Sequence, residues 1–467
     1  MSGNTKELNR SLKLLPILMI GVGGTIGTGL FLGSGRILND AGPGGMVVAY
    51  AFGALVMYLM MLILGELVTA MPNAGTVQVY TTEFISPSVG FLVGWVRWIA
   101  YGIIVPVQFV ASTNIIGNYF PSVHPFVWPV LFAILIFCLN MVPAEKYGLF
   151  NIWFSSFKFI LIIVFVLVGF ATIFGFGAVD ATGFGNITND GGLFPNGMVA
   201  VIMSMMTAAF AYSGADLFAA SASESANPEK DLPKAINSTI IGLLVAYFAS
   251  IIVIISILPW TDASVNYSPF AQVFVRSGIN AGFHIVNIIV ITSALSSANA
   301  FAYSATRTLW SMANYEQAPK FCSKLSKGKV PINALLFVMF FAIVGAALRF
   351  LMPGGYAYLF LVGLTGSANT VLYMFYAISL LYFRKEYKKL GRDVKDLKFK
   401  SPLFPITPIL SIILCLVLLG GMYWNPAQRQ SLIFGLAIYA TLYFGRVIYV
   451  KIKGDSVNPP KTENLIV

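Results

Sequence analysis

The stretch GVGGTIGTGLFLGSG, residues 21–35, decides the fold that the sequence predicts. It lies inside an apolar run long enough to cross a membrane, yet seven of its fifteen residues are glycine. Each glycine in a helix interior costs about 1 kcal/mol relative to alanine. Non-helical backbone is tolerated at membrane depth only where protein or a wet cavity surrounds it. We therefore expect the centre of this span, residues 25–29, to leave the helix and to face an aqueous site.

Close helix packing is a second explanation for these glycines, because Gly23 and Gly27 have the G-x-x-x-G spacing of helix contacts that need no ligand. A second interrupted segment favours the broken helix. TAAFAYSGADLFAASAS, residues 207–223, belongs to a sixth apolar span and has Ser213 and Gly214 near its middle. Interruptions at corresponding positions of two halves indicate a binding site near the membrane midplane.

Apolar segments of about 20 residues recur along the whole chain, each long enough to cross a hydrocarbon core of about 30 Å. Of the 467 residues, 57% are hydrophobic and 10% are charged, whereas soluble domains carry roughly 25% charged residues. The sequence thus predicts an all-α polytopic membrane protein with two five-helix repeats of inverted topology. The twelve expected spans are residues 15–38, 45–70, 89–116, 126–142, 150–174, 197–222, 237–258, 280–312, 332–351, 357–383, 404–424 and 431–450.

The net charge of +11 is spread over short loops between apolar runs, so no nucleic-acid partner is expected. Lys and Arg gather on one side of the predicted topology. They occur in the N-terminal stretch, in the loop after the eighth span and in RKEYKKLGRDVKDLKFK, residues 384–400, after the tenth. Cytoplasmic loops carry such an excess, so both termini are expected in the cytoplasm.

The two breaks offer complementary backbone groups. A half-helix that begins near Thr28 and Gly29 presents free N–H groups and the positive end of a helix dipole, which suit a carboxylate. Half-helices that stop near Thr25 and near Phe210–Ser213 leave unpaired carbonyls, which suit an ammonium group. A zwitterion fits both, so we expect an α-amino acid as the substrate.

Other functional classes lack their signatures. Cys138, Cys322 and Cys415 have no near neighbour and the chain has only two histidines, so neither a metal site nor a cofactor is expected. The chain has no H-E-x-x-H, G-x-S-x-G or P-loop motif, which argues against an enzyme. A channel needs polar residues along a continuous pore rather than two breaks at one depth. A sensor that only binds amino acid stays open, and accumulation of substrate in vesicles distinguishes it from a transporter.

Six motifs, in this order, resemble the amino acid permeases of the amino acid–polyamine–organocation superfamily, in particular the bacterial amino acid transporter branch. The resemblance extends over nearly the whole chain. The motifs are GGTIGTGLF at 23–31, AGPGG at 41–45 with LGEL at 64–67, ANPEKDLPKAI at 226–236, SALSSANA at 293–300 and QAPKF at 317–321.

The resemblance implies a LeuT-like fold with broken helices 1 and 6 and two peripheral helices. The implied ten-helix core is 15–383, with repeats at 15–174 and 197–383, and the peripheral helices are 404–450. The tails are 1–14 and 451–467. It also implies uptake of amino acids across the cytoplasmic membrane, by symport with protons or by exchange, with the proton gradient as driving force and lipid as surroundings.

Carried over to this chain, the family pattern assigns the substrate carboxylate to Thr28 and Gly29. The carbonyls of Thr25, Phe210 and Ser213 match those that accept from the amino group, and Phe210 also matches a gating aromatic residue. The remaining residues of the two breaks complete the expected binding site: Ile26, Gly27, Ala211 and Gly214.

Two acidic positions depart from the family. Asp216 stands where many members have Glu in the sixth span, which keeps a carboxylate. Gln108 stands where many have Glu in the third span, which removes one. This loss makes a cationic substrate less favoured and leaves proton coupling to other groups.

Lys158 lies well inside the fifth span, where a charge costs at least about 2.5–3.5 kcal/mol. A lysine held away from water can give up its proton. In related proton-coupled permeases a lysine here takes the place of a sodium ion beside the first break, so the resemblance implies that Lys158 carries the proton. The alternative is a lysine that reaches to the interface and only anchors its helix. For Asp216, proton sensing and orientation of the sixth-span break are equally supported.

Other polar residues in the spans have two interpretations each. Glu66 is either a cytoplasmic gate partner or a cap for a loop. Arg97, flanked by tryptophans, is interpreted as interfacial rather than as a ligand. Ser296 and Asn299 either line the cavity or join helices by hydrogen bonds. The favoured function is a proton-coupled symporter for neutral or small amino acids, and the alternatives are an amino acid exchanger and a cationic amino acid permease.

Overall fold

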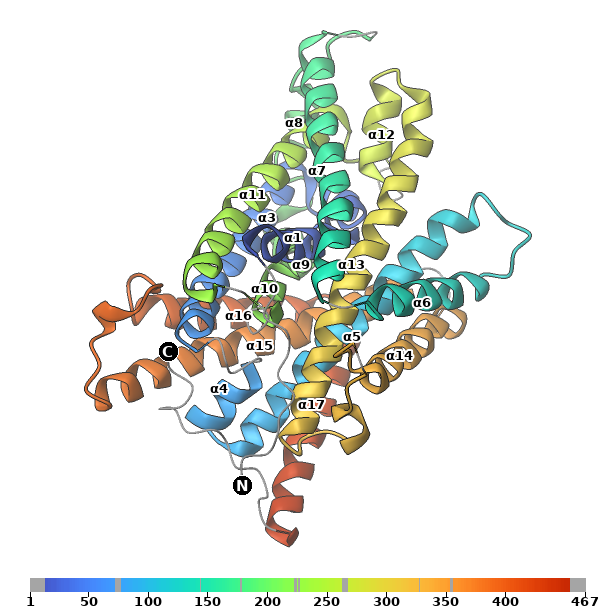
Figure 1. Ribbon diagram of the computed structural model, residues 1–467. Helices are drawn as coiled ribbons and strands as arrows, with labels where there is room; N and C mark the ends of the chain where they lie inside the picture. Colours follow the sequence, from blue (N-terminus) through green and yellow to red (C-terminus); the bar gives the residue numbers. More distant parts are fainter. Residues whose placement is uncertain are drawn as a thin grey trace.

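The computed structural model describes residues 13–71, 77–142, 144–176, 179–221, 225, 227–262, 268–326, 328–352 and 356–453. The predicted tails, 1–14 and 451–467, lie almost entirely outside this part of the chain. The described residues form a bundle of helices (Figure 1). Those of the first half are α1 (Leu14–Thr25), α2 (Thr28–Phe31), α3 (Gly33–Ala70), α4 (Val77–Phe84), α5 (Pro87–Gly117), α6 (Val127–Asn140), α7 (Ala144–Phe174) and α8 (Gly185–Thr188).

The second half begins after α8 and ends with two further helices. Its elements are α9 (Gly197–Ala211), the 3₁₀ turn η2 (Ala215–Leu217), α10 (Phe218–Ser221), α11 (Pro228–Ile257), α12 (Pro269–Arg276), α13 (Asn280–Asn314), η5 (Lys320–Ser323), α14 (Ile332–Leu351), α15 (Tyr356–Lys389), η6 (Val394–Asp396), α16 (Ile406–Trp424) and α17 (Pro426–Lys453).

Among the described residues, eleven helical segments are long and apolar enough to cross a membrane. The remaining predicted span corresponds to α6, which has 14 residues. At 1.5 Å per residue α6 covers about 21 Å, less than a hydrocarbon core of about 30 Å. The prediction of an all-α polytopic membrane protein is confirmed.

A sharp bend inside α3 separates the first two spans. Gly42 has φ 77° and ψ 178°, and Pro43 follows it. The positive φ is open to glycine at little cost, and proline cannot donate the next helical hydrogen bond. The AGPGG motif is therefore the turn between spans, and Gly44 N–H donates to the Leu193 carbonyl at 2.9 Å. The first span thus comprises α1, α2 and the part of α3 that precedes Gly42.

The two halves repeat one order of elements. Each starts with an interrupted span, continues with a long helix and then has an eight-residue helix, α4 or α12, before the next long helix. Three spans follow the short helix and complete each half: α5, α6 and α7 in the first, and α13, α14 and α15 in the second. Because five crossings are an odd number, the second half enters the membrane from the opposite side, which is the inverted topology of the predicted fold.

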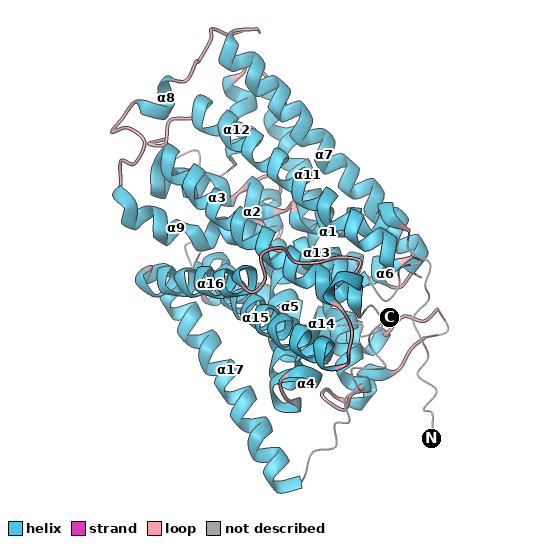
Figure 2. Ribbon diagram, turned by 90° about the vertical axis from the view of Figure 1, so that its left-hand side faces the viewer, coloured by secondary structure: helices cyan, strands magenta, loops and turns pink. Residues whose placement is uncertain are grey.

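The broken first span occupies the middle of the bundle. Helix α1 packs against α7, α11 and α13 (Figure 1). The last two helices, α16 and α17, pack against α15 at one edge of the molecule (Figure 2). Many of their apolar side chains are exposed, as expected for helices that face lipid. This arrangement surrounds the interrupted backbone with protein.

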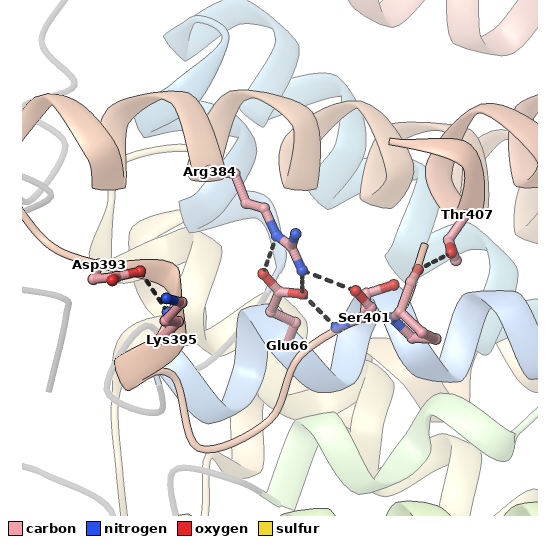
Figure 3. A network of polar contacts seen from close by, with 7 residues as sticks. Glu66, Arg384, Asp393, Lys395, Ser401 and Thr407 are labelled. Carbon is pink, nitrogen blue, oxygen red and sulfur yellow. Dashed lines mark hydrogen bonds and ion pairs between the residues drawn. The ribbon is translucent and has the colours of Figure 1, made fainter. Parts of the chain in front are cut away.

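A buried ion pair joins the end of the second span to the tenth span. The Nε and Nη2 of Arg384, on α15, donate to the two carboxylate oxygens of Glu66, on α3, each at 2.7 Å (Figure 3). The backbone N–H of Ser401 donates to Glu66 at 2.6 Å, and Arg384 donates to the Ser401 carbonyl at 2.9 Å. Glu66 therefore fastens α3, α15 and the segment before α16 together. This contact supports both predicted roles, as a gate partner and as a cap for a loop.

Replacement of Arg384 by Gln should destabilise the protein by about 3–5 kcal/mol, because it leaves the Glu66 carboxylate buried without its cation. The double variant Glu66→Gln/Arg384→Gln should recover part of this loss, since both groups are then neutral. The measurement is the thermal unfolding temperature of the purified protein in detergent. Arg392→Gln, an exposed position near the same end of α15, is the control and should unfold like the wild type. Equal unfolding temperatures for Arg384→Gln and the wild type would contradict a structural ion pair.

Candidate functional site: two helix breaks

The first break consists of Ile26 and Gly27, between α1 and α2. Both residues have extended backbone angles, with φ −73° and ψ 100° at Ile26 and φ −149° and ψ −152° at Gly27. Glycine and β-branched residues are weak helix formers, so the helix is lost most easily here. Leu32 has helical angles, and the path from Thr28 therefore continues through it into α3. The predicted break in the first span is confirmed.

Two serines of α13 satisfy carbonyls that the break exposes. The last carbonyls of a helix have no intrahelical donors, and a buried acceptor without a partner costs about 1–3 kcal/mol. Ser297 Oγ donates to the Gly24 carbonyl at 2.7 Å, and Ser293 Oγ donates to the Ile26 carbonyl at 3.1 Å. The two serines are four residues apart, so one face of α13 lies along the end of α1.

Lys158 of α7 reaches the same carbonyls. Its Nζ donates to the Ile26 carbonyl at 2.9 Å and also to the Gly23 carbonyl, and the side chain is buried. A Cβ at Gly23 would lie only 1.8 Å from Ser155 Oγ, so glycine at this position allows α7 to approach α1. Among the described residues, no carboxylate forms an ion pair with Lys158. The alternative of a lysine that reaches to the interface is wrong, because the ammonium group binds the break.

The start of α2 presents backbone donors. Leu30 and Phe31 N–H donate to the Gly27 carbonyl, both at 3.2 Å, whereas the N–H groups of Thr28 and Gly29 precede the first helical hydrogen bond. The Thr28 hydroxyl is buried and has no hydrogen-bond partner in the described part of the chain. These three donors lie together at the positive end of the helical segment. They form a group that suits an anion.

The second break consists of Tyr212, Ser213 and Gly214, between α9 and η2. Gly214 has φ 105°, which glycine adopts without the strain that other residues meet. Ser213 N–H donates to the Phe210 carbonyl at 3.0 Å, and the Asn369 side chain of α15 donates to Ser213 Oγ at 3.0 Å. The predicted break in the sixth span is confirmed, and α15 contacts it.

Tyr247 of α11 joins the two breaks. Its hydroxyl lies 2.8 Å from the Ala211 carbonyl and 3.3 Å from the Thr25 carbonyl. The ring packs against Tyr212 with centroids 4.7 Å apart, and Tyr50 of α3 contacts both rings at 6.2 and 6.3 Å. Three aromatic rings therefore pack together beside the breaks.

The expectation of unpaired carbonyls needs correction at two positions. The Thr25 carbonyl accepts from Tyr247 and the Phe210 carbonyl accepts from Ser213 N–H. The physical reason is that a neighbouring side chain and a turn supply donors to these acceptors. A carbonyl oxygen has two lone pairs, so each retains capacity for a second donor.

The two breaks touch each other through glycine. A Cβ at Gly29 would lie 2.6 Å from Ala211 Cα and 3.1 Å from Ala211 N. A Cβ at Gly214 would lie 3.1 Å from the carbonyl carbon of Gly24 and from Thr25 N. Backbone therefore packs directly on backbone where the two spans are interrupted, and both breaks lie in the middle of the bundle (Figure 1).

Asp216 follows the second break and is buried. The Tyr101 hydroxyl of α5 donates to its Oδ2. This bond connects η2 in the second half of the chain to α5 in the first half. Asp216 therefore lies at the junction of the halves, and its two predicted roles, proton sensing and orientation of the break, stay predictions.

The interfacial interpretation of Arg97 is wrong. Its side chain is fully buried, its guanidinium carbon lies 4.7 Å from the centre of the Tyr101 ring, and its Nη1 donates to Tyr376 Oη of α15 at 2.7 Å. The neighbouring Trp98 packs on Phe341 of α14 with centroids 5.3 Å apart, so this tryptophan contacts protein. The Nε and Nη2 of Arg97 have no hydrogen-bond partner among the described residues.

Of the other predicted residues, Gln108 is close to the first break. Its Nε2 is 3.1 Å from the position that a Cβ of Gly27 would occupy, and its Oε1 is buried without a partner in the described chain. Asn299 accepts from the Asn140 side chain of α6 at 2.6 Å, which supports a role in joining helices. The Ser296 hydroxyl is buried and forms no hydrogen bond with the described residues.

Several residues that contact the breaks were not predicted, and they come from helices distant in sequence. They include Tyr50, Tyr247, Ser293, Ser297 and Asn369. Only the four-residue spacing of Ser293 and Ser297 inside SALSSANA carried a signal.

Comparison with known proteins agrees with this architecture. The sequence pattern of the family described as amino acid permease matches residues 16–458. The chain is 36% identical to the amino-acid permease RocC of Bacillus subtilis over 470 residues, which cover 99% of this chain and all of the relative. It is 33% identical to the gamma-aminobutyric acid permease of the same organism over 97% of this chain and 96% of the relative. It is also 33% identical to the lysine-specific permease LysP of Escherichia coli, over 96% and 94%.

The contact between the breaks predicts that Gly29→Ala destabilises the protein by about 1–3 kcal/mol, because the added methyl group meets the backbone of Ala211. The matched control is Gly242→Ala in α11, where a Cβ would meet nothing within 4 Å. The control should be neutral or stabilising, since alanine favours the helix by about 1 kcal/mol. Thermal unfolding in detergent measures both. A Gly29→Ala variant as stable as Gly242→Ala would show that the two breaks do not pack as described.

Proposed function

This chain belongs to the amino acid permease family, and we propose that it is a proton-coupled symporter that imports neutral or small amino acids across the cytoplasmic membrane. Amino acid transport by a multi-pass membrane protein follows from the family. The substrate class, the coupling to protons, the mechanism of alternating access and the cytoplasmic location of both termini are the proposal. The observation that carries it is the contact of Lys158 with the first break.

The substrate backbone is assigned to the two breaks. The carboxylate binds the N–H groups of Thr28 and Gly29 with the Thr28 hydroxyl, which lie together at the start of α2. The ammonium group binds on the carbonyl side, where the backbone oxygens of Thr25 and Phe210 retain a lone pair. The other residues of the site are those between these groups: Ile26, Gly27, Ala211, Ser213 and Gly214.

The surroundings of the breaks support a neutral side chain. Aromatic rings, serines and the amide of Gln108 lie next to the breaks, and the Asp216 carboxylate already accepts from Tyr101. A cationic side chain would need a free carboxylate to offset its loss of water. The name of the lysine-specific relative makes lysine the second candidate.

Lys158 supports proton coupling through the strength of its two hydrogen bonds. A charged ammonium group donates roughly twice as strongly as a neutral amine. Protonation of Lys158 therefore fastens α7 to the Gly23 and Ile26 carbonyls, and loss of the proton loosens this contact. The break that binds the substrate and the group that binds the proton then share one carbonyl, that of Ile26. We assign a second proton site to Asp216. Its carboxylate accepts from Tyr101, so a proton on Asp216 would weaken the contact between η2 and α5.

Purified protein in proteoliposomes should accumulate one or a few neutral amino acids when an inward proton gradient is imposed. A gradient of one pH unit is worth about 1.4 kcal/mol, so 1:1 symport raises the internal concentration up to about tenfold. The measurement is uptake of radiolabelled alanine, serine, threonine, valine, histidine, lysine, arginine and γ-aminobutyrate, with and without the gradient. Gradient-driven uptake of lysine alone would replace the neutral substrate by a cationic one. Uptake only against trapped unlabelled amino acid would show exchange and would overturn symport.

The variant Lys158→Ala should reduce the gradient-driven accumulation ratio from about ten to about one, because no group then carries the proton beside the break. Exchange of labelled for unlabelled substrate across the membrane, measured without a gradient, should persist in this variant. Lys234→Ala, which removes an exposed lysine of α11, is the matched control and should accumulate substrate like the wild type. Accumulation by Lys158→Ala at the wild-type level would remove Lys158 from the coupling mechanism.

A further inference from the structure

A basic pocket lies at the end of α15, away from the two breaks. The last turns of α15, the 3₁₀ turn η6 and the segment before α16 line an open pocket of about 660 Å³. Five of its lining residues are cationic and one is anionic, Asp393. The cationic residues are Arg384, Lys388, Arg392, Lys395 and Lys400. None of these residues takes part in the proposed transport mechanism.

Hydrogen bonds hold the walls of this basic pocket in place. Asp393 caps η6 by accepting from Lys395 N–H at 2.9 Å (Figure 3), and Lys400 Nζ donates to the Lys395 carbonyl at 2.6 Å. Arg384 forms part of the wall, fixed from behind by Glu66, with its guanidinium carbon 4.3 Å from the centre of the Phe404 ring. Its third nitrogen, Nη1, takes part in none of the bonds to Glu66 or Ser401. These bonds hold the walls of the pocket in defined positions, and Arg384 still has a nitrogen that binds neither Glu66 nor Ser401.

The protein balances only part of the positive charge in the pocket, because Arg384 pairs with Glu66 and Asp393 is the one anionic lining residue. Lys389, one residue outside it, pairs with Glu386 at 2.7 Å. Among the described residues, no ion pair involves Lys388, Arg392, Lys395 or Lys400. Asp393 has one carboxylate oxygen engaged by the η6 cap. Like charges around one cavity repel each other unless an anion binds between them.

Membrane topology accounts for basic residues in this loop but not for the pocket. Lys and Arg anywhere near the ends of spans satisfy the positive-inside rule. They need not surround a cavity that has an immobilised arginine in its wall. The size also matters, because cavities of about 300–1,000 Å³ suit a small organic ligand. The expected ligand is thus an anion with several oxygens and more bulk than a single ion.

We propose that the pocket lined by Arg384, Lys388, Arg392, Lys395 and Lys400 binds a phosphate-bearing anion. Arginine and lysine are the usual partners of phosphate oxygens. The pocket lies at the end of α15, which is long and apolar enough to cross a membrane, and basic pockets beside the ends of such helices bind anionic headgroups. A phospholipid headgroup and a soluble phosphate ester present the same chemistry.

The test is isothermal titration calorimetry on the full-length protein in a non-ionic detergent. The probes are dioctanoyl-phosphatidylglycerol for the lipid source and inorganic pyrophosphate for the soluble source, with zwitterionic dioctanoyl-phosphatidylcholine as the reference. The pocket variant is K388Q/R392Q/K395Q, which changes three exposed residues and leaves Arg384 and its ion pair intact. The matched control is K320Q/K324Q/K329Q, which removes three exposed lysines from the loop between α13 and α14.

At least one anionic probe should bind the wild type and the control variant saturably, and its Kd should rise by at least about tenfold in the pocket variant. Binding of phosphatidylglycerol alone identifies the lipid as the source, and binding of pyrophosphate alone identifies a soluble ester. Equal Kd values in the pocket and control variants would overturn the proposal. The same conclusion follows if neither anionic probe binds the wild type more tightly than phosphatidylcholine.

Discussion

The constraint on which this structure depends is that backbone leaving a helix at membrane depth must find its hydrogen bonds inside the protein. The end of α1 exposes four carbonyls, and donors from α7, α11 and α13 reach them. An unsatisfied acceptor costs about 1–3 kcal/mol, so these helices cannot be placed independently of the break. The glycines that weaken the first span also allow neighbouring helices to come close enough to donate hydrogen bonds to its carbonyls. At Gly23, for example, a Cβ would clash with Ser155 of α7.

The two sides of the first break are not equally satisfied. Side-chain donors supply the carbonyl side, whereas the start of α2 keeps the N–H groups of Thr28 and Gly29 and a hydroxyl without partner among the described residues. A carboxylate can therefore add hydrogen bonds without breaking any. An ammonium group must use the second lone pair of a carbonyl or displace a donor such as Tyr247. On the proposed mechanism, the amino end of the substrate is thus the end that changes contacts between helices.

Sequence was sufficient for features that depend on local composition. The spans, the two breaks and the turn at AGPGG follow from apolar length, glycine content and proline, which act within a few residues. The partners of the breaks could not be predicted in the same way. Tyr247 and Asn369 lie far away in the chain, and a tyrosine or asparagine in a span has many uses. Arg97 was misinterpreted because its tryptophan neighbours are typical of an interface, whereas Arg97 and Trp98 are buried and Trp98 packs against α14.

An ionisable side chain connects each break to another helix. At the first break this side chain is a hydrogen-bond donor, and at the second it is an acceptor. Lys158 is a donor that binds the first break from outside, so its charge strengthens the hold of α7 on α1. Asp216 lies in η2, directly after the second break, and accepts from Tyr101, so its charge strengthens the hold of α5 on η2. A proton on Lys158 strengthens its hydrogen bonds to α1, because an ammonium group is a better donor than an amine. A proton on Asp216 weakens its bond to Tyr101, because a neutral carboxyl group is a poorer acceptor than a carboxylate. On the proposed mechanism, protonation therefore shifts the relative freedom of the two breaks in opposite directions, which would couple the proton to the exposure of the site on one side or the other.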